Sequence, residues 1–106
     1  METKMQNEFP IKIRSFWDGW FSCLLCQVNQ NLELHHILGR RSDSMLNSAA
    51  VCHICHSKGN IHSPETELEL LEKTWEIVTA RKWQFSYTDL LFIVKYKDFY
   101  EEIANN

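Results

Sequence analysis

Two closely spaced cysteine pairs constrain the fold of this chain more than any other feature. Cys23 and Cys26 form one C-x2-C pair, Cys52 and Cys55 form the other, and 25 residues lie between the pairs. A two-residue gap lets both thiolates of a pair reach one ion, and two pairs complete a closed tetrahedral zinc site. The pairs therefore predict a structural Zn²⁺, and the long gap between them permits an inserted structural unit. Two redox-active pairs or ordinary buried thiols are the alternatives.

The length and composition indicate one globular domain. The chain has 106 residues, of which 44% are hydrophobic and 24% charged, and these proportions exclude a disordered tail. So short a chain buries only about 60–65% of its unfolded surface, and domains of this size often need a metal or a disulfide as a staple. The four cysteines and five histidines are candidates for it. We expect a single domain over 1–106, with a zinc-stapled core over 23–62 and an acidic helical extension over 63–106.

Two features of the chain bear on its location. The longest apolar run, 90–94, is far shorter than the ~20 residues of a membrane span. The first eight residues lack the apolar core of a signal peptide. We expect a cytoplasmic protein without membrane association, whose cysteines stay reduced.

The charge of the chain is unevenly distributed. Residues 1–62 carry a formal charge of +1 and residues 63–106 one of −4, while every Cys and His lies between Cys23 and His62. The acidity is thus separated from the residues that can do chemistry. The acidic C-terminal helices, with Trp75, Trp83 and Tyr96 as anchors, leave room for a protein partner.

Local patterns predict an α+β fold. The aromatic residues 9–22 are expected to wrap the core as a lead-in, with a weak strand-like alternation at its start. We expect strands over 32–37 and 47–51 and a helix over 52–60. Two C-terminal helices should follow, one beginning at Ser63-Pro64 and one over 88–103 after a capping box at 86–89.

The residues between the cysteine pairs carry a specific pattern. Leu32-Glu-Leu-His-His-Ile37 is followed by Asn47 and then by Cys52-His-Ile-Cys-His56. Here the chain resembles the HNH endonuclease family, in the subgroup where a four-cysteine zinc flanks a ββα-metal finger. The resemblance covers about residues 23–60. It implies a metal-dependent enzyme that cleaves DNA and leaves 5′-phosphate and 3′-hydroxyl ends.

Adjacent strand residues point to opposite faces, so His35 and His36 are not expected to share a role. The resemblance implies that His35 and His56 bind the catalytic metal and that His36 is the general base. Histidine can accept a proton at neutral pH. The resemblance also implies Asn60 as a third metal ligand and Asn47 as the residue that ties the loop and orients the base.

The remaining polar residues of this region have simpler expected roles. We expect His53 to be structural and keep His62 as a reserve ligand. Arg40, Arg41 and Lys58 are candidates for contacts with nucleic-acid phosphates, since the planar Arg fork suits phosphate; solvated surface positions are the alternative.

Two departures qualify the expected chemistry. The first ligand is His where the family more often has Asp, and imidazole ligands favour Mn²⁺, Ni²⁺, Co²⁺ or Zn²⁺ over Mg²⁺. The net charge of −3 does not favour DNA binding.

A non-cleaving zinc-stabilised binding module, or an accessory subunit of a phage DNA-processing complex, is the alternative function. Compact free-standing members of the family are common in phages, so the resemblance also implies a phage origin.

Overall fold

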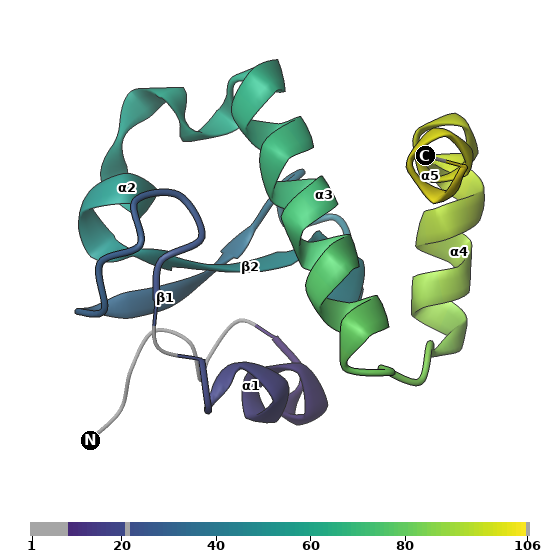
Figure 1. Ribbon diagram of the computed structural model, residues 1–106, viewed down its shortest axis with the longest axis horizontal. Helices are drawn as coiled ribbons and strands as arrows, with labels where there is room; N and C mark the ends of the chain where they lie inside the picture. Colours follow the sequence, from purple (N-terminus) through teal and green to yellow (C-terminus); the bar gives the residue numbers. More distant parts are fainter. Residues whose placement is uncertain (1–8, 21, 106) are drawn as a thin grey trace.

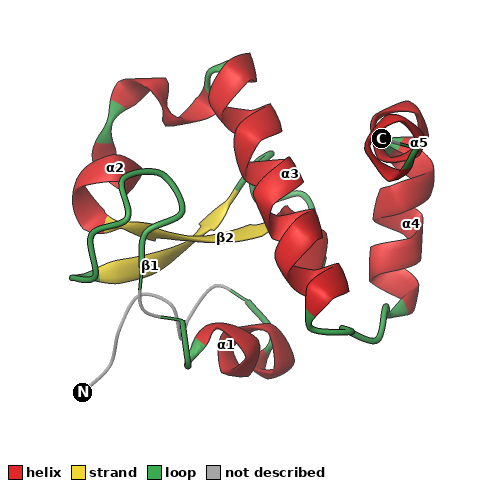
Figure 2. Ribbon diagram, in the orientation of Figure 1, coloured by secondary structure: helices red, strands yellow, loops and turns green. Residues whose placement is uncertain are grey.

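The computed structural model describes residues 9–20 and 22–105, which form a small mixed α+β fold (Figures 1 and 2). In chain order its elements are α1 (Ile11–Trp17), β1 (Leu32–His36), η2 (Met45–Asn47), β2 (Ser48–Cys52), α2 (His53–Ser57), η3 (Gly59–His62), α3 (Pro64–Ala80), α4 (Tyr87–Lys95) and α5 (Lys97–Ala104). The η elements are short 3₁₀ helices.

The two predicted strands are confirmed. β1 pairs antiparallel with β2, with His35 opposite Ala49 and His36 opposite Ser48. α2 begins directly after β2, where the Cys52 Sγ accepts a hydrogen bond from the Cys55 N–H. α2 is shorter than the helix expected over 52–60, because the backbone is extended at Lys58. The helical conformation resumes after Lys58 only as the 3₁₀ helix η3.

α3 crosses beside the sheet and packs against β2 and η2 (Figure 1). Its predicted start at Ser63-Pro64 is confirmed, since the Ser63 side chain accepts a hydrogen bond from the Thr66 N–H. Such a cap contributes about 1 kcal/mol. On the buried face of α3, the Thr74 hydroxyl donates to the Ser48 carbonyl at 2.8 Å, which fixes the helix to the second strand.

The aromatic lead-in differs from the strand-like start that its alternation indicated. It forms the helix α1, because Phe9, Ile13 and Trp17 recur every four residues and are all buried. The Trp17 indole N–H donates to the Ser48 hydroxyl at 2.9 Å. The lead-in therefore packs against the core as expected, but as a helix.

The C-terminal segment also differs from expectation. The helix expected over 88–103 breaks at Tyr96 (φ −114°, ψ 41°), so three helices, and not two, follow Ser63 in the described chain. The break turns α5 so that the Tyr100 ring comes within 5.1 Å of Trp75 on α3. The predicted capping box of Ser86 and Asp89 is confirmed.

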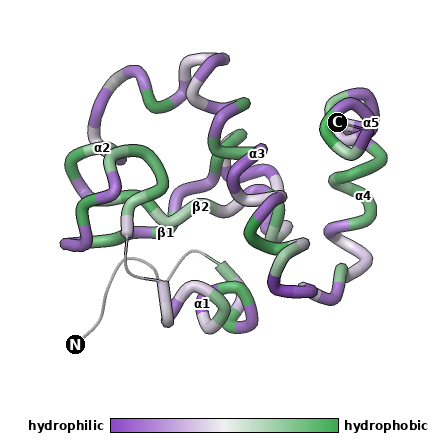
Figure 3. The backbone as a smooth tube through the Cα atoms, viewed as in Figure 1, coloured by the Kyte–Doolittle hydropathy of each residue, from purple (hydrophilic) through white to green (hydrophobic). Residues whose placement is uncertain are grey.

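The apolar run 90–94 lies on α4, where Figure 3 shows a mostly green stretch of backbone. No helix among residues 9–20 and 22–105 is both long and apolar enough to cross a membrane.

Candidate functional site

The four cysteines come together from two distant segments. Their sulfur atoms all lie within 4.8 Å of one another. The first pair sits in a tight turn, in which the N–H groups of Leu25 and Cys26 point at the Cys23 Sγ at 3.4 and 3.5 Å. Gln27 follows with a positive φ of 69°, which closes the turn. The cluster could hold a structural metal such as zinc.

The electrostatics of the cluster fit a cation. Burial raises the pKa of the Cys23 thiol, but backbone N–H groups outweigh it and bring that pKa down to about 7. Burial and the neighbouring thiols raise the pKa of Cys55 to about 12. Four crowded thiolates would repel one another, and the positive charge of a bound Zn²⁺ would offset this repulsion and so favour the deprotonated form of its thiol ligands.

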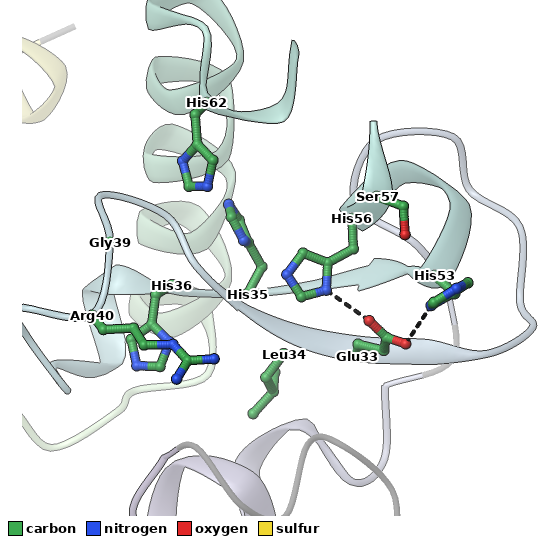
Figure 4. A pocket seen from close by; sticks show the side chains of 10 residues that line it. All are labelled: Glu33, Leu34, His35, His36, Gly39, Arg40, His53, His56, Ser57 and His62. Carbon is green, nitrogen blue, oxygen red and sulfur yellow. Dashed lines mark hydrogen bonds and ion pairs between the residues drawn. The ribbon is translucent and has the colours of Figure 1, made fainter. Parts of the chain in front are cut away.

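All five histidines line one cavity of about 500 Å³ (Figure 4). Successive strand residues alternate between faces, so Glu33 and His35 of β1 lie on one face and His36 on the other. α2 brings His53 and His56 over Glu33, and η3 brings His62 above His35 (Figure 4). The cavity therefore collects histidine side chains from three elements, β1, α2 and η3.

His35 has the environment of a neutral ligand. It is 2% exposed, and its Nε2 has no hydrogen-bond partner among the described residues. Its ring centroid lies 4.9 Å from those of both His56 and His62. Burial and then the charges of the other histidines lower the pKa of His35 to about 3, so the imidazole is uncharged at neutral pH. A buried imidazole nitrogen that no described protein group contacts is available to bind a metal ion.

Carboxylates orient the two rings that face His35. The Glu33 carboxylate bridges His56 Nδ1 at 2.7 Å and His53 Nδ1 at 2.8 Å. Glu67 Oε2 lies 3.6 Å from His62 Nδ1. This leaves Nε2 of His56 and of His62 for a metal, the usual pattern around ligating histidines. No group of histidines among the described residues is as tightly gathered as the cysteines, so binding an ion would draw these rings closer together.

His36 is held from two sides. Its ring stacks on Phe9 with centroids 3.9 Å apart, and its Nε2 lies 3.1 Å from an Asp43 carboxylate oxygen. Asn47, which is fully buried, ties together the loop that follows β1. Its side chain accepts from the Leu38 N–H at 2.8 Å and donates to the carbonyls of Gly39 and Ser42. Asn47 thus ties the loop together. The side chain that contacts the His36 Nε2 is that of Asp43.

The remaining predicted site residues are not all at this cavity. Arg40 lines it, whereas Arg41 lines a second cavity on α4. Asn60, expected as the third metal ligand, lines a separate cavity beside Cys26 and Cys55, as does Lys58. The 3₁₀ conformation of η3 replaces the α-helical turn that would have aligned Asn60 with His56, and it presents His62 to His35 instead.

Comparisons with known proteins find no match: no family model, no curated protein and no solved structure is similar to this chain.

Sequence reasoning missed Glu33 and Asp43. Glu33 had a readable signal, because it stands two residues before His35 and so shares its strand face. Asp43 had none, because its approach to His36 depends on the path of the loop after β1.

Proposed function

We propose that this protein is a metal-dependent endonuclease of the HNH type that hydrolyses phosphodiester bonds in DNA. The observation that carries this proposal is the convergence of His35, His36, His56 and Arg40 on one cavity. His36, Asn47 and His56 also occur in the order and spacing of the HNH pattern, and the two antiparallel strands and the helix around them adjoin the four-cysteine cluster.

His35 and His56 would hold the catalytic ion. We assign the third position to His62 in place of Asn60, because its ring lies 4.9 Å from that of His35. Three imidazoles favour Mn²⁺, Co²⁺, Ni²⁺ or Zn²⁺ over Mg²⁺. Bound there, the ion would polarise the phosphate and neutralise the leaving oxygen.

His36 is the general base in this proposal. It takes a proton from the water that attacks phosphorus, and the new bond from that water oxygen to phosphorus replaces the bond from phosphorus to the 3′ oxygen. The 3′ oxygen leaves as an alkoxide and takes a proton from a solvent water, so that 5′-phosphate and 3′-hydroxyl ends result. The Asp43 carboxylate at 3.1 Å stabilises the imidazolium that forms. Stacking on Phe9 and the loop tied by Asn47 fix the position of the ring.

Arg40 supplies positive charge at the same cavity and would contact a phosphate of the bound strand.

The test is metal-dependent cleavage of supercoiled plasmid by the wild-type protein, with each divalent ion added in turn after dialysis against chelator. We expect nicking or linearisation with Mn²⁺, Co²⁺ or Ni²⁺ at least as fast as with Mg²⁺, and ends that DNA ligase rejoins without kinase treatment. If no ion supports cleavage while DNA is still bound, the protein is a binding module and the proposal fails.

A further inference from the structure

A second cavity, of about 450 Å³, lies on the other side of the loop that follows β1. One wall is that loop and its anchor, including Leu38, Arg41 and Asn47. The opposite wall is α4 and the residue after it, including Leu91, Lys95 and Tyr96. Gly39 lines both this cavity and the histidine cavity, so the two are neighbours. We call this second space the loop–helix cavity.

The chemistry of the loop–helix cavity fits an anion with an apolar body. Arg41 and Lys95 enter from opposite walls, and neither pairs with a carboxylate within the described chain. The Lys95 ammonium lies 5.7 Å from the centroid of the Tyr96 ring. The carboxylate of Asp43, which also lines the cavity, is bonded to His36. Leu38, Leu91 and Phe92 supply apolar surface.

The two walls are fixed relative to each other. Asp89 near the start of α4 accepts hydrogen bonds from the Ser44 hydroxyl at 2.6 Å and the Met45 N–H at 2.9 Å, both at the end of the loop. Asn47 holds the other end of the loop through Leu38 and Gly39. Both Asp89 and Asn47 are buried. The cavity is therefore preformed, which lowers the ordering cost of binding.

We propose that the loop–helix cavity binds a nucleotide of the cleaved DNA strand next to the scissile phosphate, with Arg41 and Lys95 on its phosphate and the apolar wall against its sugar or base. The inference rests on the proposed nuclease function. Arg40 and Arg41 are consecutive and line different cavities, so one loop can contact neighbouring phosphates of the same strand. In this proposal α4 contributes to the DNA-binding surface, although residues 63–106, to which it belongs, carry a net negative charge.

The experiment measures fluorescence anisotropy of a short labelled DNA duplex across a salt series. Every variant is made in the His36→Ala background so that the probe stays intact. We expect Lys95→Ala and Arg41→Ala each to weaken binding severalfold and to lower the magnitude of the salt slope by about 1. Lys95→Arg should restore both quantities. Lys97→Ala is the matched control, because Lys97 is 67% exposed and pairs with Glu101 on α5.

A second readout uses bis(p-nitrophenyl) phosphate, which carries one phosphodiester and so offers no second phosphate to Arg41 or Lys95. With His36 intact, Lys95→Ala should leave its hydrolysis unchanged while slowing plasmid cleavage. Equal binding and equal salt slopes for Lys95→Ala, Arg41→Ala and Lys97→Ala would overturn the inference and leave the nuclease proposal standing. Conversely, if the wild type never cleaves but the slopes change as expected, the nuclease proposal fails and the DNA contact remains.

Discussion

Glu33 controls the orientation of two imidazoles with one carboxylate. Its oxygens contact His56 Nδ1 and His53 Nδ1 at 2.7 and 2.8 Å. Burial raises the pKa of the Glu33 carboxyl, but the hydrogen bonds from His56 and His53 outweigh it and hold that pKa below its ordinary value. Glu33 is thus ionised at neutral pH, and it fixes which nitrogen of His56 faces His35.

Replacing this carboxylate should weaken the proposed catalytic metal site without emptying the cysteine site. For Glu33→Gln we expect a ~10–100-fold loss of affinity for the catalytic ion, the usual cost of losing such a partner. Isothermal titration of the zinc-loaded protein with Mn²⁺ or Co²⁺ measures this. Glu69→Gln on the exposed face of α3 is the control. An unchanged affinity in Glu33→Gln would remove Glu33 from the site.

The residues of the site were predictable to the extent that they follow strand geometry. The opposite faces of His35 and His36 follow from the two-residue period of β1, and the facing position of His56 follows from the cysteine spacing. The choice between Asn60 and His62 did not follow, because it depends on the helix α2 ending at Ser57, three residues before Asn60. Helical spacing predicted Asn60, whereas the 3₁₀ turn brings His62 to His35.

Asp89 joins the capping of α4 to the loop of the candidate site. It is 1% exposed, and its two oxygens accept hydrogen bonds from Ser44, Met45, Trp83 and Ser86. Burial raises the pKa of this carboxyl, yet these donors outweigh it and the pKa lies below its ordinary value. One side chain therefore caps a helix and holds the segment that leads to Asn47.

The linkage between protonation and folding gives this carboxylate a defined pH dependence. Because its pKa is lower in the folded state, its contribution is complete above the unfolded value of ~3.9 and is lost as the pH falls through the folded value. Asp89→Asn should lower the free energy of unfolding at pH 7 by on the order of 2–3 kcal/mol, and its deficit should shrink below pH ~4. Urea titrations at several pH values measure this.

The exposed Asp98 on α5 provides the control, and Asp98→Asn should change stability by no more than ~0.5 kcal/mol. A deficit in Asp89→Asn that stayed constant from neutral to acidic pH would contradict the role given to the Asp89 charge.

Elements with a strong local signal were predicted well. The caps at Ser63 and Ser86 are side-chain effects confined to a few residues, and both are confirmed. α1 was not predicted, because a seven-residue helix is marginal alone and gains its stability from burying Ile13 and Trp17. The break at Tyr96 is likewise tertiary, since it lets Tyr100 pack on Trp75.

At the scale of the whole molecule, the cysteine cluster joins two segments that are distant in sequence. Cys26 and Cys52 are 26 residues apart, and their sulfur atoms lie 3.7 Å from each other. The sheet of two strands is too small to be stable alone. Metal binding in sites of this kind is folding free energy, about 10–16 kcal/mol for structural zinc.

We therefore expect one tightly bound zinc per chain, and Cys52→Ser should unfold the region around the sheet. Elemental analysis and circular dichroism measure the two effects. His35→Ala is the comparison, since it should keep both the zinc and the fold. A reduced chain that stays folded after chelation of all metal would contradict the structural role of zinc.

The nuclease proposal depends most directly on the different roles of two adjacent histidines, His35 as a metal ligand and His36 as the general base. Cleavage of supercoiled plasmid and binding of the catalytic ion should be measured on the same preparations of wild type, His36→Ala and His35→Ala. We expect His36→Ala to retain the ion but to cleave ~10²–10⁴ times more slowly, because it loses only the proton acceptor. His35→Ala should lose the ion together with cleavage. Cleavage by His36→Ala at the wild-type rate would contradict the account.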